Sequence, residues 1–244
     1  MKASRQAQES LLHLQDIDVT LDQHDFRRAS LPQHSRLGEL ATQIEAAERD
    51  SVQWTTRAGD LTRQVRRVEN DVEQVRTRVQ RDRTLLDSGS ITSGKQLTDL
   101  EREIASLGRR ICDLEDDQLA VMEELEDAIA QSDAAATELS ELRAEQAAVA
   151  ASRDEQVDVI AREVAAEQAE RDGTVAQIPA DLLALYVKLR AQHGGVGAAR
   201  LRHGRCEGCH LQLPPTEYAR LKAEAPDEVV RCEECRRILV RDVE

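Results

Sequence analysis

Hydrophobic residues recur along most of this chain at alternating spacings of three and four. The first regular run extends from Leu37 to Leu86 within a predicted helix 33–86, and Ser51 and Asp82 are its polar interruptions. Residues three and four positions apart share one face of an α-helix, so a stripe that repeats every seven residues fits against a partner helix. Charged residues fill the flanking positions, which makes the stripe narrow and predicts a two-helix coiled coil.

Turn-forming residues separate this run from a second one. Residues 87–94 read Asp-Ser-Gly-Ser-Ile-Thr-Ser-Gly, a composition that ends a helix. The same spacing then resumes and predicts a descending helix over residues 95–172, in which we expect polar Gln118 and Ser132 to fix the register. Two long helices joined by one short turn form a helical hairpin, with its tip at residues 87–94.

The two predicted helices differ in length. Residues 95–172 would extend ~117 Å at about 1.5 Å per residue, whereas residues 33–86 would extend only ~81 Å. A further helix over residues 5–30 supplies ~39 Å, and we expect it to stack on the ascending helix. Pro32 marks the break, because proline removes a helical hydrogen-bond donor and disfavours helix at the residue before it.

The composition agrees with an elongated helical protein rather than a large globular core. Only 2% of the residues are aromatic and 33% are charged, whereas a compact core of this size buries many more rings. A narrow coiled coil offers no pocket of useful volume, and no Ser-His-Asp, Cys-His or paired-carboxylate arrangement stands out. We therefore expect no catalytic residues, no enzymatic activity and no small-molecule substrate.

The net charge of -14 is unevenly distributed along the sequence. Residues 1–173 hold 22 Lys and Arg against 37 Asp and Glu, whereas residues 174–244 hold 11 against 10. Duplex nucleic acid would be repelled by the first segment and tolerated only at the second. The longest apolar run, residues 182–187, is too short to span a bilayer, and the first ten residues lack the apolar stretch of a signal peptide. We expect a cytoplasmic protein without a membrane partner.

The change in charge coincides with a predicted boundary between two domains, residues 1–173 and 174–244. Gly173 is a candidate C-cap for the descending helix. A short amphipathic helix over residues 182–190 follows, and we expect it to pack the C-terminal domain onto the hairpin. The glycine-rich segment 193–197 lacks the Lys-Ser/Thr of a phosphate-binding loop, so we interpret it as a flexible connection.

Two Cys-x-x-Cys pairs lie in the second domain. Cys206 and Cys209 form the first pair, and Cys232 and Cys235 form the second after 22 intervening residues. Each pair can bring two thiolates together from one tight turn, and two pairs complete the tetrahedron that zinc prefers. Sulfur would fill all four coordination positions and leave none for water or substrate, so we predict one structural zinc ion.

Short strand patterns surround these cysteines. Residues 210–213 alternate between polar and apolar, two prolines end that pattern, and residues 229–230 and 238–240 flank the second cysteine pair. This order is typical of a zinc ribbon. The predicted fold class is therefore mainly α, a long antiparallel coiled-coil hairpin with a small C-terminal zinc β-ribbon domain.

Other uses of the cysteines fit less well. A redox Cys-x-x-Cys would need a thioredoxin-like strand and helix, and iron–sulfur clusters usually have different spacings. His210 is an alternative ligand beside Cys209, although four cysteines already suffice. The fifth cysteine, Cys112, falls on the rim of the heptad seam, where we interpret it as an exposed side chain, with a redox contact as the alternative.

Several segments together resemble a known bacterial family. They are the heptad stripes, the Ser88–Gly94 tip, Ile178-Pro179 before Leu182-Leu-Ala-Leu-Tyr186, and the two cysteine segments Gly204–Cys209 and Val230–Cys235. The chain looks like the C4-type zinc-ribbon proteins with an N-terminal coiled-coil hairpin, and the resemblance covers essentially the whole chain. It implies a hairpin docked to a zinc ribbon, with zinc on the four matching cysteines. Members of that family are generally described as nucleic-acid-binding or regulatory adaptor proteins, not enzymes.

The first functional hypothesis is nucleic-acid binding by the ribbon. Arginines lie close to the cysteines in sequence, and the planar guanidinium group suits phosphate. The alternative is that these arginines form ion pairs with Glu207, Glu233 and Glu234 on a solvated surface. The candidate phosphate-binding residues are Arg200, Arg202, Arg205, Arg231, Arg236, Arg237 and Arg241.

The second hypothesis is a protein-interaction scaffold that binds no nucleic acid. The acidic hairpin, through its surface or its tip at residues 88–95, would attract a basic protein partner and steer its approach. The two hypotheses are compatible, because they use different ends of the sequence.

Overall fold

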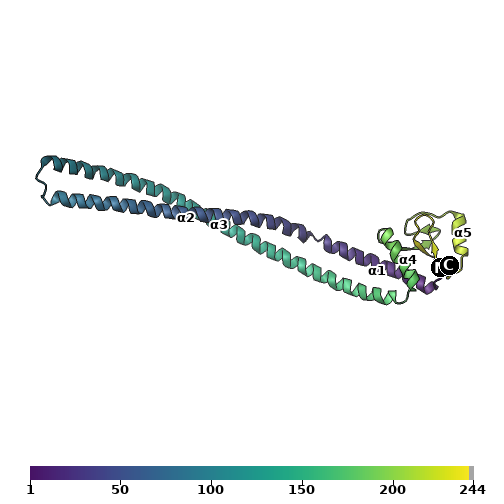
Figure 1. Cartoon of the computed structure of the whole chain (residues 1–244). Coiled ribbons are helices and arrows are strands. Elements are labelled where there is room, and N and C mark those ends of the chain that lie inside the picture. The colour runs from purple at the N-terminus through teal and green to yellow at the C-terminus, as the bar shows by residue number, and fades with distance from the viewer. Residues whose placement is uncertain (242–244) are drawn as a thin grey trace. The chain divides into compact units, whose positions relative to one another are not determined.

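The computed structural model describes residues 1–241 of the chain. Three long helices come first, and a short helix leads into a region of strands and one further helix (Figure 1). The last three positions of the predicted second domain, 242–244, lie outside the described residues. The elements are α1 (Arg5–Ala29), α2 (Pro32–Asp87), α3 (Gly94–Val175), α4 (Ala180–Gln192), β1 (Ala198–Arg202), β2 (Arg205–Cys206), α5 (Pro215–Ala223), β3 (Val230–Arg231) and β4 (Ile238–Arg241).

The chain divides into two compact units. We call residues 36–149 the hairpin unit, and residues 1–35 together with 150–244 the ribbon unit. The ribbon unit therefore includes α1 and the end of α3, which the sequence-based division at residue 173 assigns to the hairpin. Residues 1–35 and 150–244 form one unit because they contact one another in space, although they are far apart along the chain.

The hairpin unit is an antiparallel pair formed by α2 and α3 (Figure 1). Its buried seam includes Leu61 and Val65 of α2, packed with Val121 and Ala128 of α3. These positions belong to the predicted heptad stripes, and burying each aliphatic side chain contributes roughly 1.5–3 kcal/mol. The predicted fold class, a coiled-coil hairpin with a small C-terminal ribbon, is confirmed.

Polar contacts along the seam pair particular turns of the two helices. The Ser132 hydroxyl lies 3.2 Å from that of Thr55, and Gln118 donates to the Glu69 carboxylate at 3.5 Å. Exposed arginines form further pairs across the helices, such as Arg57 with Glu124 at 2.6 Å. Each exposed pair adds little free energy, but together they favour one register. The outer faces of these two helices are therefore polar. None of the helices in residues 1–241 is long and apolar enough to cross a membrane.

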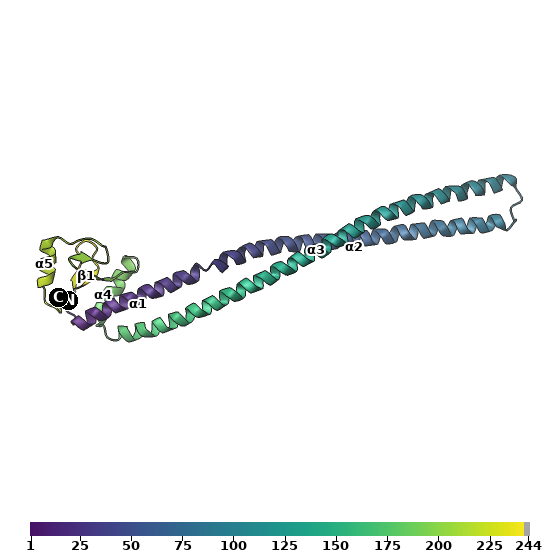
Figure 2. The ribbon, with the colours of Figure 1, turned by 180° about the vertical axis from the view of Figure 1, so that it is seen from behind.

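The ribbon unit has a core shared by four elements. Leu11 and Leu14 of α1 pack with Leu182 of α4 and with Ala198 and Ile238 from the strands. Figure 2 shows the start of α1 beside α4 and the sheet. The predicted short helix therefore packs against α1 and the strands within the ribbon unit, and its bounds are wider than the predicted 182–190.

A buried carboxylate joins the helices of the ribbon unit. Asp18 on α1 is only 3% exposed and accepts hydrogen bonds from the Tyr186 hydroxyl at 2.6 Å and from Arg171 Nε at 2.7 Å. Arg190 lies 3.4 Å from the same carboxylate and donates to Asp22 at 2.6 Å. Burial, together with the bond to Asp18, raises the pKa of Tyr186 above its usual range, so this phenol remains a donor. A buried charge with this many partners holds α1, α3 and α4 together.

The connection from α4 to β1 is fixed by α1. The Gln15 side chain donates to the Gly195 carbonyl at 2.8 Å and accepts from the Gly197 amide at 2.7 Å. A Cβ at Gly197 would lie 2.7 Å from the Tyr186 carbonyl oxygen, so only glycine fits between the connection and α4. The glycine-rich segment 193–197 is therefore anchored to α1, whereas the sequence predicted a flexible connection.

The ends of the three long helices lie within one residue of the predictions except at the end of α3. The break between α1 and α2 falls at Ser30 and Leu31, next to Pro32 as expected. The prediction that Gly173 caps the descending helix is wrong, because α3 continues to Val175. A glycine inside a helix costs about 1 kcal/mol relative to alanine, and burial of Thr174 in the next position supports the added turn.

The sheet has the order β2-β1-β4-β3. Its central pair, β1 and β4, is parallel, with Ala198 opposite Ile238, and both neighbouring pairs are antiparallel. The predicted strands near the second cysteine pair are present as β3 and β4. The predicted strand over 210–213 is wrong: only an isolated bridge between Arg205 and Gln212 forms there. Neither β1 nor β2 coincides with a predicted strand.

Candidate metal centre and basic groove

Two similar turns bring the four cysteines together. Cys206 ends β2, and its carbonyl accepts the His210 amide at 2.8 Å, so the chain turns back after Cys209. Cys232 follows β3, and its carbonyl accepts the Arg236 amide at 2.9 Å. The residue after each second cysteine has positive φ, 59° at His210 and 64° at Arg236.

The sulfur positions fit a tetrahedral metal. The four Sγ atoms of these cysteines lie within 4.8 Å of one another. Cys206 Sγ is 3.9 Å from Cys235 Sγ, and Cys209 Sγ is 4.0 Å from Cys232 Sγ. Zn–S bonds of about 2.3 Å in a tetrahedron place the sulfurs about 3.8 Å apart, whereas a disulfide needs about 2.05 Å. The predicted cofactor is supported: the four cysteines can hold one zinc ion.

The site is embedded in a small core of its own. Cys206 and Cys232 are fully buried and pack with Leu201 and Leu239 of the central strands. Gly208 lies against Ala199 of β1, and a Cβ at Gly208 would come within 2.9 Å of the Ala199 Cβ. The requirement for glycine at this turn therefore comes from close packing rather than from a positive φ.

Burial disfavours the thiolate form of two ligands. It raises the pKa of the Cys206 thiol to about 12 and raises the pKa of Cys232 as well. Burial also opposes ionisation of Cys235, but hydrogen bonds from Arg237 and from neighbouring thiols outweigh it and lower that pKa. Because zinc binds thiolates, binding must release the protons of Cys206 and Cys232.

Zinc affinity should therefore fall as the pH falls. Protons compete with the metal for every thiol that is neutral without it, so we expect an apparent affinity at least about tenfold weaker per pH unit between pH 8 and 6. Competition with a chromophoric chelator at pH 6, 7 and 8 measures this slope. An affinity independent of pH would contradict the assignment of Cys206 and Cys232 as ligands.

The other sulfur and nitrogen candidates stay outside the site. His210 is exposed, and it contributes its backbone carbonyl, which accepts from Arg205 Nε at 2.9 Å. Among residues 1–241 the cysteine cluster is the one group of potential ligands close enough to hold a metal ion. Cys112 is free and exposed on α3, within the hairpin unit.

Comparison with known proteins agrees with both parts of this description. A family model described as CT398-like coiled coil hairpin domain matches residues 14–194, and a C4-type zinc ribbon domain model matches residues 205–239. The chain belongs to the CT398-like hairpin family. The resemblance inferred from the sequence is therefore confirmed, and the zinc-ribbon match contains all four cysteines.

Relatives of this CT398-like protein extend over its full length. Two uncharacterized proteins of Mycobacterium tuberculosis strains are 39% identical over 241 residues, covering 99% of this chain and 98% of theirs. A solved structure from Mycobacterium smegmatis has a TM-score of 0.85 at 33% identity and covers 99% of this chain and 100% of its own. CT398 from Chlamydia trachomatis has a TM-score of 0.68 at 16% identity over 97% and 98% of the two chains, which is a likeness of fold.

Four of the seven candidate arginines bind backbone carbonyls of the protein itself. Arg241 donates to four of them, at distances from 2.6 to 3.0 Å, around the end of α5. Arg237 donates to Val196 and His193, while Arg231 and Arg205 each donate through Nε to one carbonyl. These side chains hold loops of the CT398-like protein in place, a role that sequence proximity to the cysteines did not predict.

A basic groove lies on the ribbon unit beside β1. Its volume is about 550 Å³, and Arg200, Arg202 and Arg241 line it, whereas the other four candidate arginines do not. Two cations outside the predicted set also line it, Arg5 of α1 and Lys222 of α5. We define the basic groove by these five side chains together with Gln8, Leu201, His203, Tyr218, Glu224, Pro226 and Val240.

The strand geometry explains the position of these arginines. Arg200 and Arg202 alternate with buried Ala199 and Leu201 along β1, so both project from the exposed face of the strand. The lining contains five Lys and Arg side chains against one carboxylate, that of Glu224. The groove therefore concentrates positive charge in a protein whose net charge is -14.

Proposed function

We propose that this protein binds single-stranded nucleic acid in the basic groove of its ribbon unit. The observation that carries the proposal is the convergence of Arg5, Arg200, Arg202 and Lys222, from α1, β1 and α5, on one concave surface. Arg241 of β4 completes the wall of that surface, where its guanidinium donates to carbonyls around the end of α5. Lys and Arg side chains bind phosphate, and a groove that follows a strand can track a backbone. The partly buried ring of Tyr218 adds an aromatic surface on which a base can stack.

The acidic remainder of the chain supports a single-stranded ligand over a duplex. A duplex presents charge on all sides and would be repelled by the many carboxylates of the hairpin unit. A single strand can lie within the groove, and its flexible backbone can follow the cations. Phosphates of a single strand would therefore contact the protein within the basic groove alone.

We also propose that the protein acts by binding rather than by catalysis. The four thiolates would fill the zinc tetrahedron and leave no position for a water nucleophile. Two of the four ligands, Cys206 and Cys232, are fully buried, and Cys209 and Cys235 are partly buried. Zinc then has a structural role and shapes the strand that carries Arg200 and Arg202.

The test is a binding titration with a fluorescent 12-nucleotide single-stranded RNA at several salt concentrations. The variant Arg5→Ala/Arg202→Ala removes one predicted and one unpredicted cation from the groove. We expect binding to weaken about tenfold and the salt slope to fall by about 1.4, because each lost phosphate contact removes about 0.7 from the slope.

A matched control removes two cations from the hairpin unit. Arg49→Ala/Arg63→Ala changes the net charge equally, and both side chains are exposed and lie outside the groove. We expect this variant to bind RNA as the unmodified protein does. Equal weakening by both variants, or no salt-dependent binding by the unmodified protein, would contradict the proposal.

A further inference from the structure

One part of α3 has exposed apolar side chains in a regular pattern. Leu119, Met122 and Ile129 are 59%, 38% and 46% exposed. Only two other large apolar side chains are as exposed in the hairpin unit, and they lie singly on α2. An apolar cluster on an otherwise charged coiled coil marks a surface for interaction. We call Leu119, Met122 and Ile129 the α3 side face.

The α3 side face lies beside the buried seam rather than behind it. Met122 and Ile129 follow buried Val121 and Ala128 by one position each, which rotates them by about 100° around the helix. A two-helix coiled coil needs apolar residues only along its seam, whereas a helix with more neighbours has a wider apolar stripe. The stripe of α3 is widened over about three turns, enough for one additional helix.

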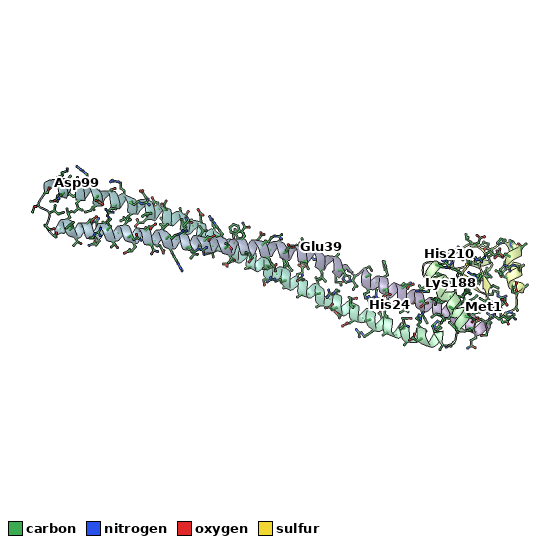
Figure 3. The ribbon with its side chains drawn as sticks, in the orientation of Figure 1. Met1, His24, Glu39, Asp99, Lys188 and His210 are labelled. Atoms are coloured by element: carbon green, nitrogen blue, oxygen red, sulfur yellow. The ribbon has the colours of Figure 1, made fainter. Side chains whose placement is uncertain are left out.

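The neighbouring surface of α2 is made of small residues. Thr55, whose hydroxyl lies 3.2 Å from that of Ser132, is followed at helical spacing by Gly59 and Thr62. A Cβ at Gly59 would meet nothing closer than an Arg63 side-chain nitrogen at 3.7 Å. Ser132 is one turn after Ile129. Together with Thr55, Gly59 and Thr62 of α2, it forms a strip of small side chains beside the α3 side face. Figure 3 shows side chains standing out along both helices.

Charge specifies what can cover this strip. Residues 111–142 of α3 contain eleven Asp and Glu and neither Lys nor Arg. Arginines of α2 neutralise two of these, pairing Arg57 with Glu124 and Arg76 with Glu115. Glu126 and Asp133 lie along the side face at helical spacing from Leu119, Met122 and Ile129 and are exposed. The face is therefore apolar along its middle and negative along its edge.

We propose that the α3 side face binds an amphipathic helix of a basic partner protein. Apolar side chains of the partner at helical spacing would cover Leu119, Met122 and Ile129, and flanking Lys or Arg would meet Glu126 and Asp133. The same face of a second copy fits less well than a basic helix, because it would bring Glu126 and Asp133 against acidic side chains of the same kind. This binding is independent of the basic groove, which lies on the other unit of the chain.

The probe is a fluorescent 21-residue helical peptide with leucines at heptad spacing and lysines elsewhere. We expect Leu119→Gln/Met122→Gln/Ile129→Gln in the full chain to bind it at least about tenfold more weakly than the unmodified protein, because anchors in the middle of a helix-binding surface dominate affinity. All three side chains are exposed, so the variant should retain its helicity, which circular dichroism checks. A scrambled peptide of equal composition has no face on which its leucines gather. It should bind the unmodified protein about as weakly as the heptad peptide binds the triple variant.

A matched pair of charge variants separates the side face from general attraction. Glu126→Gln/Asp133→Asn neutralises acids beside Met122 and Ile129, whereas Asp116→Asn/Asp127→Asn removes the same charge from another side of α3. We expect the first pair to weaken peptide binding severalfold more than the second. Equal effects of the two pairs, or unchanged binding by the triple glutamine variant, would overturn the proposal. A dimer of the unmodified chain in sedimentation that the triple variant abolishes would also overturn it, because a second copy would then cover the face.

Discussion

Removing zinc from this protein should unfold the ribbon while leaving the hairpin unit helical. The core around the cysteines is small, and two of its fully buried members, Cys206 and Cys232, are themselves metal ligands. Structural zinc contributes ~10–16 kcal/mol in zinc-finger peptides. Here the second core, in which Ala198 of β1 and Ile238 of β4 pack with α1 and α4, offsets part of that loss. We expect hydrogen exchange of the strand amides in β1 and β4 to accelerate by roughly a thousandfold or more after chelation.

Two internal comparisons make this result specific. Trp54 is the single tryptophan and packs in the hairpin seam, so its fluorescence should not change when zinc is removed. Cys232→Ser should reproduce the effect of chelation, whereas Cys112→Ser, at an exposed free cysteine of α3, should not. Strand amides that stay protected without zinc would contradict the structural role of the metal.

Replacing Asp18 should produce the second large loss of stability. Asp18→Asn removes the negative charge that faces Arg171 and Arg190 and accepts the Tyr186 hydroxyl. Breaking a buried ion pair on one side typically costs about 3–5 kcal/mol, because the remaining charges lose their partner. We expect the free energy of unfolding of the ribbon unit to fall by about 3 kcal/mol.

The measurement can be confined to the ribbon unit. Both tyrosines of the chain, Tyr186 and Tyr218, lie in it, so tyrosine fluorescence in a Trp54→Phe background follows its unfolding in urea. Asp22→Asn is the control, because Asp22 pairs with Arg190 from a half-exposed position and should cost less than about 1 kcal/mol. A loss from Asp18→Asn no larger than that from Asp22→Asn would argue against a buried charge network.

The parts of the fold predicted well from sequence are those determined by local spacing. Heptad positions such as Leu61 and Val121 are buried because a helix repeats every 3.6 residues, whatever the rest of the chain does. The cysteine turns are local in the same sense, since three residues suffice to bring Cys206 and Cys209 to one metal. Both predictions depend on neighbours in sequence.

The features that could not be predicted depend on residues far apart in sequence. β1 forms because Ala198 pairs with Ile238, forty positions later, and its own sequence has only a weak strand pattern. Arg5 lines the basic groove although it precedes the predicted candidates by nearly 200 positions. Arg241 was predicted to bind phosphate, yet its donors face carbonyls of the α5 loop. The sequence shows that an arginine lies near the cysteines, but it does not show which groups the arginine side chain contacts in the fold.

The contacts between α1 and the glycine-rich connection have a consequence during protein synthesis. Gln15 bonds to Gly197 across 182 positions, whereas the seam of the hairpin unit can close turn by turn as α3 emerges after the tip. At about 5–20 residues per second, the ribosome needs on the order of 10 to 40 seconds to add this segment after Gln15. Throughout that interval Leu11 and Leu14 have no core to enter, so nascent α1 presents an uncovered apolar face. We expect general chaperones that recognise such faces to bind the nascent chain through its first helix.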